Sequence, residues 1–213
     1  RGSGLLPHPQ KIEAFLEATL PAIPTRLSVK VRLGRKKTDE ILALLPIFNR
    51  YPLDEVIVHP RTGKQMYDGE PNLDMFEKCL EACAHTTVYN GDINDLATFK
   101  DFSQRFQTVD RWMIGRGALI NPFLPAAIKS GKDKVTDKVK VFRVFYEDLF
   151  EQYRQEFRGP GHLLDRMKGF WTYFSQAFKD GRKIKKKIHR THNLDRYLKI
   201  VERFFEEEAQ WVD

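Results

Sequence analysis

Four short apolar segments of the sequence end in polar or glycine residues whose chemistry suits an anionic or planar ligand. The last of them ends in Gly115-Arg116-Gly117. Glycine lets backbone N–H groups approach an anion, and arginine adds a charge-assisted pair of donors. A Gly-x-Gly turn alone is often only a tight turn, so its interpretation depends on the three similar segments before it, which are residues 28–34, 54–61 and 86–92.

The earliest segment has two cations at alternate positions. Lys30 and Arg32 alternate with Val29, Val31 and Leu33, so both cations are expected on one face of a strand. A strand buried on both sides does not take two cations without an anionic partner or a ligand. Lys30 is therefore predicted to place its ammonium against an anionic or electron-accepting ring, as flavin enzymes require. The alternative is an exposed lysine at a strand end.

His59 ends the second segment and is followed by a loop with Arg61, Gln65 and Tyr67. A lone histidine there is usually structural, but this combination suits a planar heterocycle or a phosphate. The sequence contains no Ser-His-Asp pattern, no cluster of metal ligands and no Walker loop. Hydrolysis and nucleotide-triphosphate chemistry are therefore poorly supported, and no metal is expected.

The elements that position these residues alternate between strand and helix. Such alternation favours a parallel sheet, and in a parallel α/β barrel the carboxyl ends of the strands converge on one rim. A phosphate often binds there after the last two strands, which here end in Asn90-Gly91-Asp92 and Gly115-Arg116-Gly117. Helices are predicted at 10–20, 38–50, 72–84 and 94–106, with Thr38-Asp39 and Asn72 as N-caps, and another opens near Asn121-Pro122.

Beyond residue 135 the sequence is typical of amphipathic helices, with apolar residues spaced three and four apart. From Arg154 to Lys199 there are 13 Lys or Arg against four acidic residues, which favours a polyanionic partner. Within 182–190, Ile184 and Ile188 are expected to face the helical core. The basic face is expected to comprise Lys183, Lys185, Lys186, Lys187 and Arg190.

The composition is that of a globular chain of 213 residues with a net charge of +7. Cys79 and Cys83 lie four apart in a helical pattern with no second pair, so they are interpreted as structural residues of a reduced, cytosolic protein. No apolar stretch is long enough to span a membrane. No protein partner is expected, and the chain is predicted to be monomeric.

The four strand ends together resemble the tRNA-dihydrouridine synthases, in order and in spacing. The matching segments are Val29-Lys-Val-Arg-Leu-Gly34, His59-Pro-Arg-Thr, Asn90-Gly-Asp-Ile and Met113-Ile-Gly-Arg-Gly-Ala. The tail also resembles the family's helical domain, through Met167-Lys-Gly-Phe-Trp and the basic helix. The resemblance implies an α/β fold: about the last four units of a (β/α)8 TIM barrel (residues 1–130), followed by a helical tRNA-binding bundle (135–213).

The resemblance also implies the chemistry, which is FMN-dependent reduction of uridine to dihydrouridine in tRNA with NADPH or NADH as the reductant. Lys30, His59, Asn90, Gly91, Asp92, Gly115 and Arg116 would then bind the cofactor. Arg32, Arg61 and the basic face would contact substrate or tRNA. Two alternatives stay open: a flavin oxidoreductase of the dihydroorotate dehydrogenase type, and a non-catalytic tRNA-binding protein.

The departure from the family lies at the start of the chain. Arg1-Gly-Ser-Gly-Leu-Leu resembles the segment just after the family's catalytic loop, whose cysteine protonates the uracil ring. Cys79 and Cys83, expected on an outer helix, cannot replace that cysteine. No catalytic residue is therefore assigned within the chain, which is expected to be a segment of a longer protein and inactive alone.

Overall fold

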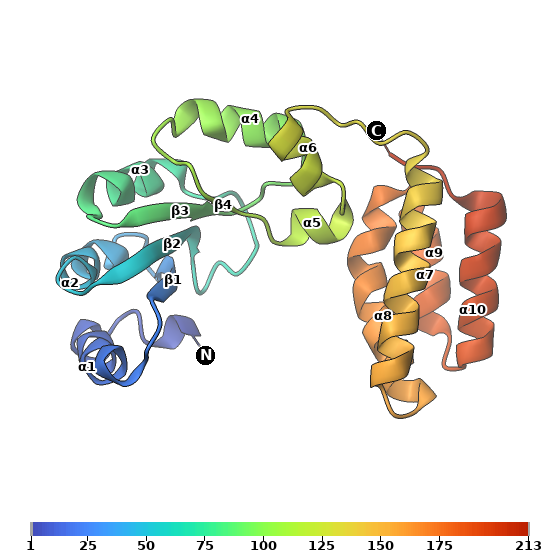
Figure 1. Ribbon diagram of the computed structural model, residues 1–213, viewed down its shortest axis with the longest axis horizontal. Helices are drawn as coiled ribbons and strands as arrows, with labels where there is room; N and C mark the ends of the chain where they lie inside the picture. The colour runs from blue at the N-terminus through green and yellow to red at the C-terminus, as the bar shows by residue number, and fades with distance from the viewer. Residues whose placement is uncertain (1, 213) are drawn as a thin grey trace. The chain divides into compact units, whose positions relative to one another are not determined.

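The computed structural model describes residues 2–212, and the ends Arg1 and Asp213 lie outside the described residues. The chain forms two compact units, which Figure 1 colours along the sequence. The first comprises residues up to Ile93 together with Thr98–Gly115, and the second comprises Asn94–Ala97 with the chain from Arg116 onward. The predicted flavin-binding and tRNA-binding domains stay predictions, because a division into compact units does not test what each unit binds.

The first unit is a parallel α/β structure. Its four strands have the order β1-β2-β3-β4, and helices connect them, as Figure 1 shows. This confirms an α/β fold with a parallel four-stranded sheet. The elements are η1 (Gly2–Gly4), α1 (Pro9–Thr19), η2 (Leu20–Ala22), β1 (Leu27–Gly34), η3 (Glu40–Ala43), α2 (Leu45–Phe48), β2 (Leu53–Thr62), α3 (Leu73–Ala82), β3 (Thr86–Asn90), α4 (Leu96–Arg105) and β4 (Trp112–Met113).

One face of the sheet packs against helices. The Tyr89 ring in β3 contacts Phe76 of α3 and both Phe102 and Phe106 at α4, with ring centroids 4.9 to 5.6 Å apart. Tyr89, Phe76 and Phe106 are buried. Burial of such large rings contributes to the apolar stabilisation of this face.

The opposite face presents the polar strand residues, and we call it the Lys30 face. Lys30 pairs with Ile57, and Arg32 pairs with His59, so these side chains point to the same side of the sheet. The expectation that this strand is buried on both sides is wrong for β1, whose Ser28 and Lys30 are exposed. The reason is that β1 is an edge strand of this sheet.

The predicted helix over 38–50 is also wrong. The segment forms the short 3-10 helix η3 and then the single turn α2, which begins at Leu45 and contains Pro46. Proline lacks the N–H that a continuous helix would need at that position. The cap expected at Thr38-Asp39 is only partly present, because Asp39 lies at the N-cap position of η3 but its side chain forms no capping hydrogen bond. The Glu40 carboxylate accepts hydrogen bonds from the backbone N–H groups of residues 35, 36 and 37. The Asn72 cap is confirmed, because its side chain accepts from the Met75 N–H.

The second unit is helical, and its aromatic core includes the buried Phe142, Trp171 and Phe204. Ile184 and Ile188 are buried in the same core, as the amphipathic pattern predicted. No helix within residues 2–212 has both the length and the apolar character required to cross a bilayer. The elements are α5 (Arg116–Ile120), α6 (Leu124–Ser130), α7 (Lys138–Glu156), α8 (Pro160–Phe174), η4 (Ser175–Ala177), α9 (Gly181–Arg190), α10 (Leu194–Arg203) and η5 (Phe204–Glu208).

Candidate functional site

The strand register gathers the predicted ligand-binding residues at the carboxyl ends of adjacent strands. Arg32 in β1 is paired with His59 in β2, and Asn90 ends β3. The Asn90 side chain donates a 2.8 Å hydrogen bond to the Met113 carbonyl at the end of β4. Asn90 thus joins the two last strands, and the parallel sheet brings these strand ends to one edge.

His59 is neutral at physiological pH in this environment. Its side chain is buried, and burial together with the cations Arg32, Lys30 and Arg61 lowers the His59 pKa to about 4, while Asp92 acts in the opposite direction. Partial desolvation at the sheet and the Arg32 charge also lower the pKa of Lys30, although this residue is largely exposed. Both shifts arise first from desolvation and then from the concentration of positive charge on the Lys30 face.

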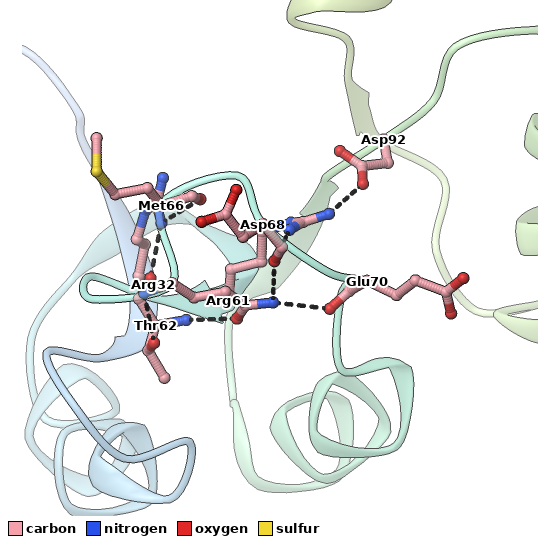
Figure 2. Close-up of polar contacts among 8 residues, drawn as sticks. Arg32, Arg61, Thr62, Met66, Asp68, Glu70 and Asp92 are labelled. Carbon is pink, nitrogen blue, oxygen red and sulfur yellow. Dashed lines mark hydrogen bonds and ion pairs between the residues drawn. The ribbon is translucent and has the colours of Figure 1, made fainter.

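Arg61 occupies a different place from the one predicted for a tRNA-contacting residue. Its residue exposure is 1%, and the guanidinium forms an ion pair with Asp92 and donates a 2.7 Å hydrogen bond to the Asp68 carbonyl (Figure 2). Type and spacing alone could not distinguish a ligand-binding arginine from one that pairs internally. In this structure the Arg61 side chain binds the backbone at Asp68, and the carboxylate of Asp92 pairs with the Arg61 guanidinium.

The loop over 62–70 is held by the side chain of Arg32 in β1, as Figure 2 shows, and by its own Gln65. Arg32 donates 2.7 Å hydrogen bonds to the carbonyls of Thr62 and Met66. Gln65 donates to the carbonyls of Asp68 and Glu70 at 2.8 and 3.0 Å. The loop is therefore held through its backbone carbonyl groups.

Two exposed side chains lie at the tip of this loop. Met66 and Tyr67 are 61% and 54% exposed. The Tyr67 ring lies 6.3 Å from the His59 ring and 5.5 Å from the Arg32 guanidinium carbon, measured from its centroid. The predicted grouping of Arg61, Gln65 and Tyr67 around His59 is thus present, although Arg61 and Gln65 support the loop from within.

The two glycine turns, at Gly91 and Gly115, differ in how closely other atoms pack against them. A methyl group added at Gly91 would lie 3.4 Å from His59 Cδ2, so this turn is packed against His59. A methyl added at Gly115 would meet no atom within 4 Å. The helix expected to open near Asn121-Pro122 is present as α6, which begins at Leu124, and a separate short helix, α5, begins at Arg116 directly after Gly115. A phosphate cradle formed by Gly91, Gly115 and Arg116 stays a prediction.

The basic face of α9 is divided by internal ion pairs. Lys183 pairs with Asp180 at 3.1 Å, and Lys187 pairs with Glu208 at 2.8 Å. In the part of the chain that the structure describes, Lys185, Lys186 and Arg190 form no ion pair. The charges best placed to meet a polyanion are therefore these three.

Sequence inspection missed one cation near α9. Partial burial, followed by the charges of Lys185 and of Lys168 in α8, lowers the pKa of His189. His189 also lies 3.4 Å from the Thr172 hydroxyl, measured from Nε2 to Oγ1. The spacing of four between Lys185 and His189 could have indicated a shared side of α9, but nothing in the sequence indicates that α8 contributes Lys168.

The cysteines have the structural character that their spacing indicated. Cys79 is buried, which raises the pKa of its thiol to about 12, and both cysteines are free. A thiol with so high a pKa is a poor proton donor or nucleophile at neutral pH. Between residues 2 and 212 no group of three or more metal-ligating side chains comes together.

The comparisons with known proteins identify the class of molecule. The family model for dihydrouridine synthase (Dus) matches residues 1–210, so the chain belongs to the dihydrouridine synthase family. A "Probable tRNA-dihydrouridine synthase" of Rickettsia prowazekii is 30% identical over 161 residues, which is 71% of this chain and 49% of that protein. The chain thus spans about half the length of the Rickettsia relatives that it matches.

Two further relatives are aligned over nearly the whole chain. The tRNA-dihydrouridine(16) synthase of Vibrio parahaemolyticus is 24% identical over 97% of this chain and 64% of its own length. The "Probable tRNA-dihydrouridine synthase 2" of Bacillus subtilis is 26% identical over 100% of this chain and 64% of its own length. The similarity therefore extends across the strand ends and the helical unit alike.

Proposed function

We propose that this chain is the part of a tRNA-dihydrouridine synthase that binds a flavin at its strand ends and tRNA through its helical unit. Residues 1–130 would supply half of a TIM barrel, and 135–213 the RNA-binding helices. The observation that best supports this is the Lys30 face, where Lys30 in the middle of β1 lies on the same side of the sheet as Arg32 and a neutral His59 near the carboxyl ends of parallel strands.

The residues present fit a flavin mononucleotide by their chemistry. Lys30 would place its ammonium at the electron-accepting part of the ring, where positive charge stabilises the reduced state. The neutral His59 would provide a ring nitrogen for a hydrogen bond without adding another positive charge. Backbone donors at Gly91 and Gly115, with Arg116, would hold the phosphate. The flavin would supply the hydride for C6 of the uridine.

The substrate side of the site follows from the same face. A uridine must leave the folded tRNA stack before its C5–C6 bond can reach a flavin. Arg32 would orient the extruded base or the flavin, because its guanidinium lies between the loop 62–70 and β1. The proton for C5 would come from a cysteine outside this chain, since Cys79 is buried with a raised pKa.

The test uses the full-length protein, tRNA transcripts and a nicotinamide donor. Expected results are a bound flavin chromophore in the purified protein, bleaching of that chromophore by NADPH or NADH, and dihydrouridine in the product tRNA. Oxidation of free dihydroorotate to orotate, with no reduction of tRNA, would support the alternative enzyme class. Tight tRNA binding without any flavin would support the non-catalytic alternative.

A further inference from the structure

One buried guanidinium connects two segments that lie apart in the sequence. Arg61 Nη1 donates a 2.7 Å hydrogen bond to the Asp68 carbonyl in the 62–70 loop. Arg61 Nη2 pairs with the carboxylate of Asp92, in the turn that follows β3 (Figure 2). We call residues 90–92 the 90–92 turn. Because the Arg61 residue is only 1% exposed, water cannot readily replace either partner.

Each connected segment lies beside His59 on the candidate site. A methyl added at Gly91, in the 90–92 turn, would lie 3.4 Å from His59 Cδ2. Tyr67, in the 62–70 loop, has its ring centroid 6.3 Å from that of His59. The turn is the segment proposed to hold the cofactor, and the loop presents its exposed tip on the same side. Arg61 therefore connects the 90–92 turn, which is predicted to bind the cofactor, with the 62–70 loop.

The backbone at both segments is strained and needs support. Asp92 has φ 43° and Met66 has φ 52°, which are left-handed conformations that side chains other than glycine adopt with difficulty. Such conformations persist only where surrounding contacts fix them. Arg61 fixes Asp92 by its ion pair, and Arg32 fixes Met66 through its carbonyl.

We propose that Arg61 is a positioning residue that couples the 90–92 turn to the 62–70 loop, so that a ligand held at the turn orders the loop. This proposal rests on the proposed function, because it takes the ligand at the turn to be flavin mononucleotide. A ligand that restrains the 90–92 turn also restrains Asp92. Through its ion pair, Asp92 restrains the Arg61 guanidinium, which in turn restrains the Asp68 carbonyl. Ordering the loop in advance lowers the entropy cost of binding the substrate.

The first experiment measures amide hydrogen exchange in the full-length protein without ligand. The reporters are the N–H groups of Gly63, Lys64 and Asp68, which donate to the carbonyls of residues 34, 35 and 65. Asp92→Asn leaves Arg61 buried without its counter-charge, so the loop should open and exchange roughly tenfold faster or more. Unchanged exchange at these amides would overturn the coupling.

A matched control is available on β2, the strand that contains Arg61. Asp54→Asn removes the exposed ion pair with Arg26, whose N···O distance is 2.8 Å. It also removes one carboxylate, so it has the same effect on net charge as Asp92→Asn. Exchange at the reporter amides should stay at the wild-type rate in this control. An equal acceleration in both variants would show a general loss of stability and contradict the proposal.

The second experiment adds flavin mononucleotide. Binding should slow exchange at Asp68 in the wild-type protein. The variant Arg61→Met removes the buried cation, and the Asp92 carboxylate, whose side chain is 23% exposed, stays hydrated, so the fold is kept. It should bind flavin without slowing Asp68, and slowing in this variant would refute the coupling. Failure of every variant to bind flavin would refute the proposed cofactor, whereas the first experiment would still decide whether Asp92 holds the loop.

Discussion

The sharpest functional prediction concerns the basic face of α9. Replacing Lys185, Lys186 and Lys187 by Gln should weaken tRNA binding across tRNA species and flatten its dependence on salt. Each phosphate contact that is lost reduces the slope of log affinity against log salt by about 0.7 to 0.9. Lys187 already pairs with Glu208 at 2.8 Å, so only two full contacts should be lost. The expected reduction is therefore about 1.4 to 1.8.

The structure supplies a matched pair of variants for this prediction. Lys186→Gln with Arg190→Gln removes two cations that form no ion pair in the described part of the chain, and should reduce the slope by the same amount. Lys183→Gln with Lys187→Gln removes two cations that already pair with Asp180 and Glu208. This second variant should change the slope far less, although both remove two positive charges.

The assay is equilibrium tRNA binding by fluorescence anisotropy, with the full-length protein, at roughly 50 to 200 mM salt. Flavin content should be the same in all variants, which separates RNA binding from cofactor binding. Wild-type affinity and slope in the triple variant would refute the assignment of RNA binding to α9. Equal losses in the two double variants would refute the inference that internal ion pairs decide which cations contact RNA.

Three further predictions concern the sheet. Arg116→Ala should lower the flavin content of the purified full-length protein, and unchanged flavin absorbance would count against a phosphate contact. Lys30→Met keeps most of the side-chain length and removes the charge, so it should slow flavin or uridine reduction without lowering the melting temperature. The His59 pKa is lowered from 6.5 to about 4. Neutral His59 therefore contributes about 3 kcal/mol to the free energy of unfolding above pH 6.5, and this contribution is lost as the pH falls through about 4. Urea unfolding across that range should show a shallower pH dependence in His59→Gln, and parallel curves would contradict the assigned pKa.

Regular periodicity made part of this structure predictable. Lys30 and Arg32 alternate with apolar residues, and a strand's period of two places both on one face whatever the sheet around them. Ile184 and Ile188 lie one helical turn apart, and both are buried. In each case the pattern repeats over several residues, so the local geometry alone determines which side chains are grouped.

Contacts between distant segments could not be predicted in this way. Lys187 has the same residue type as Lys186, yet only Lys187 pairs with a distant carboxylate, that of Glu208, which lies 21 residues further along the chain. The partner in such cases is selected by the tertiary fold and leaves no local pattern.

The pairing of Arg61 with Asp92 changes the charge that a ligand would meet. Counted by type, the strand ends offer three cations, Lys30, Arg32 and Arg61, around His59. The Asp92 carboxylate offsets Arg61, and burial together with the remaining positive charge keeps His59 neutral. Lys30 and Arg32 are therefore the cations left for an anionic ligand. A ligand that brings negative charge to this face should raise the His59 pKa, so its binding should take up a proton at pH values just above 4.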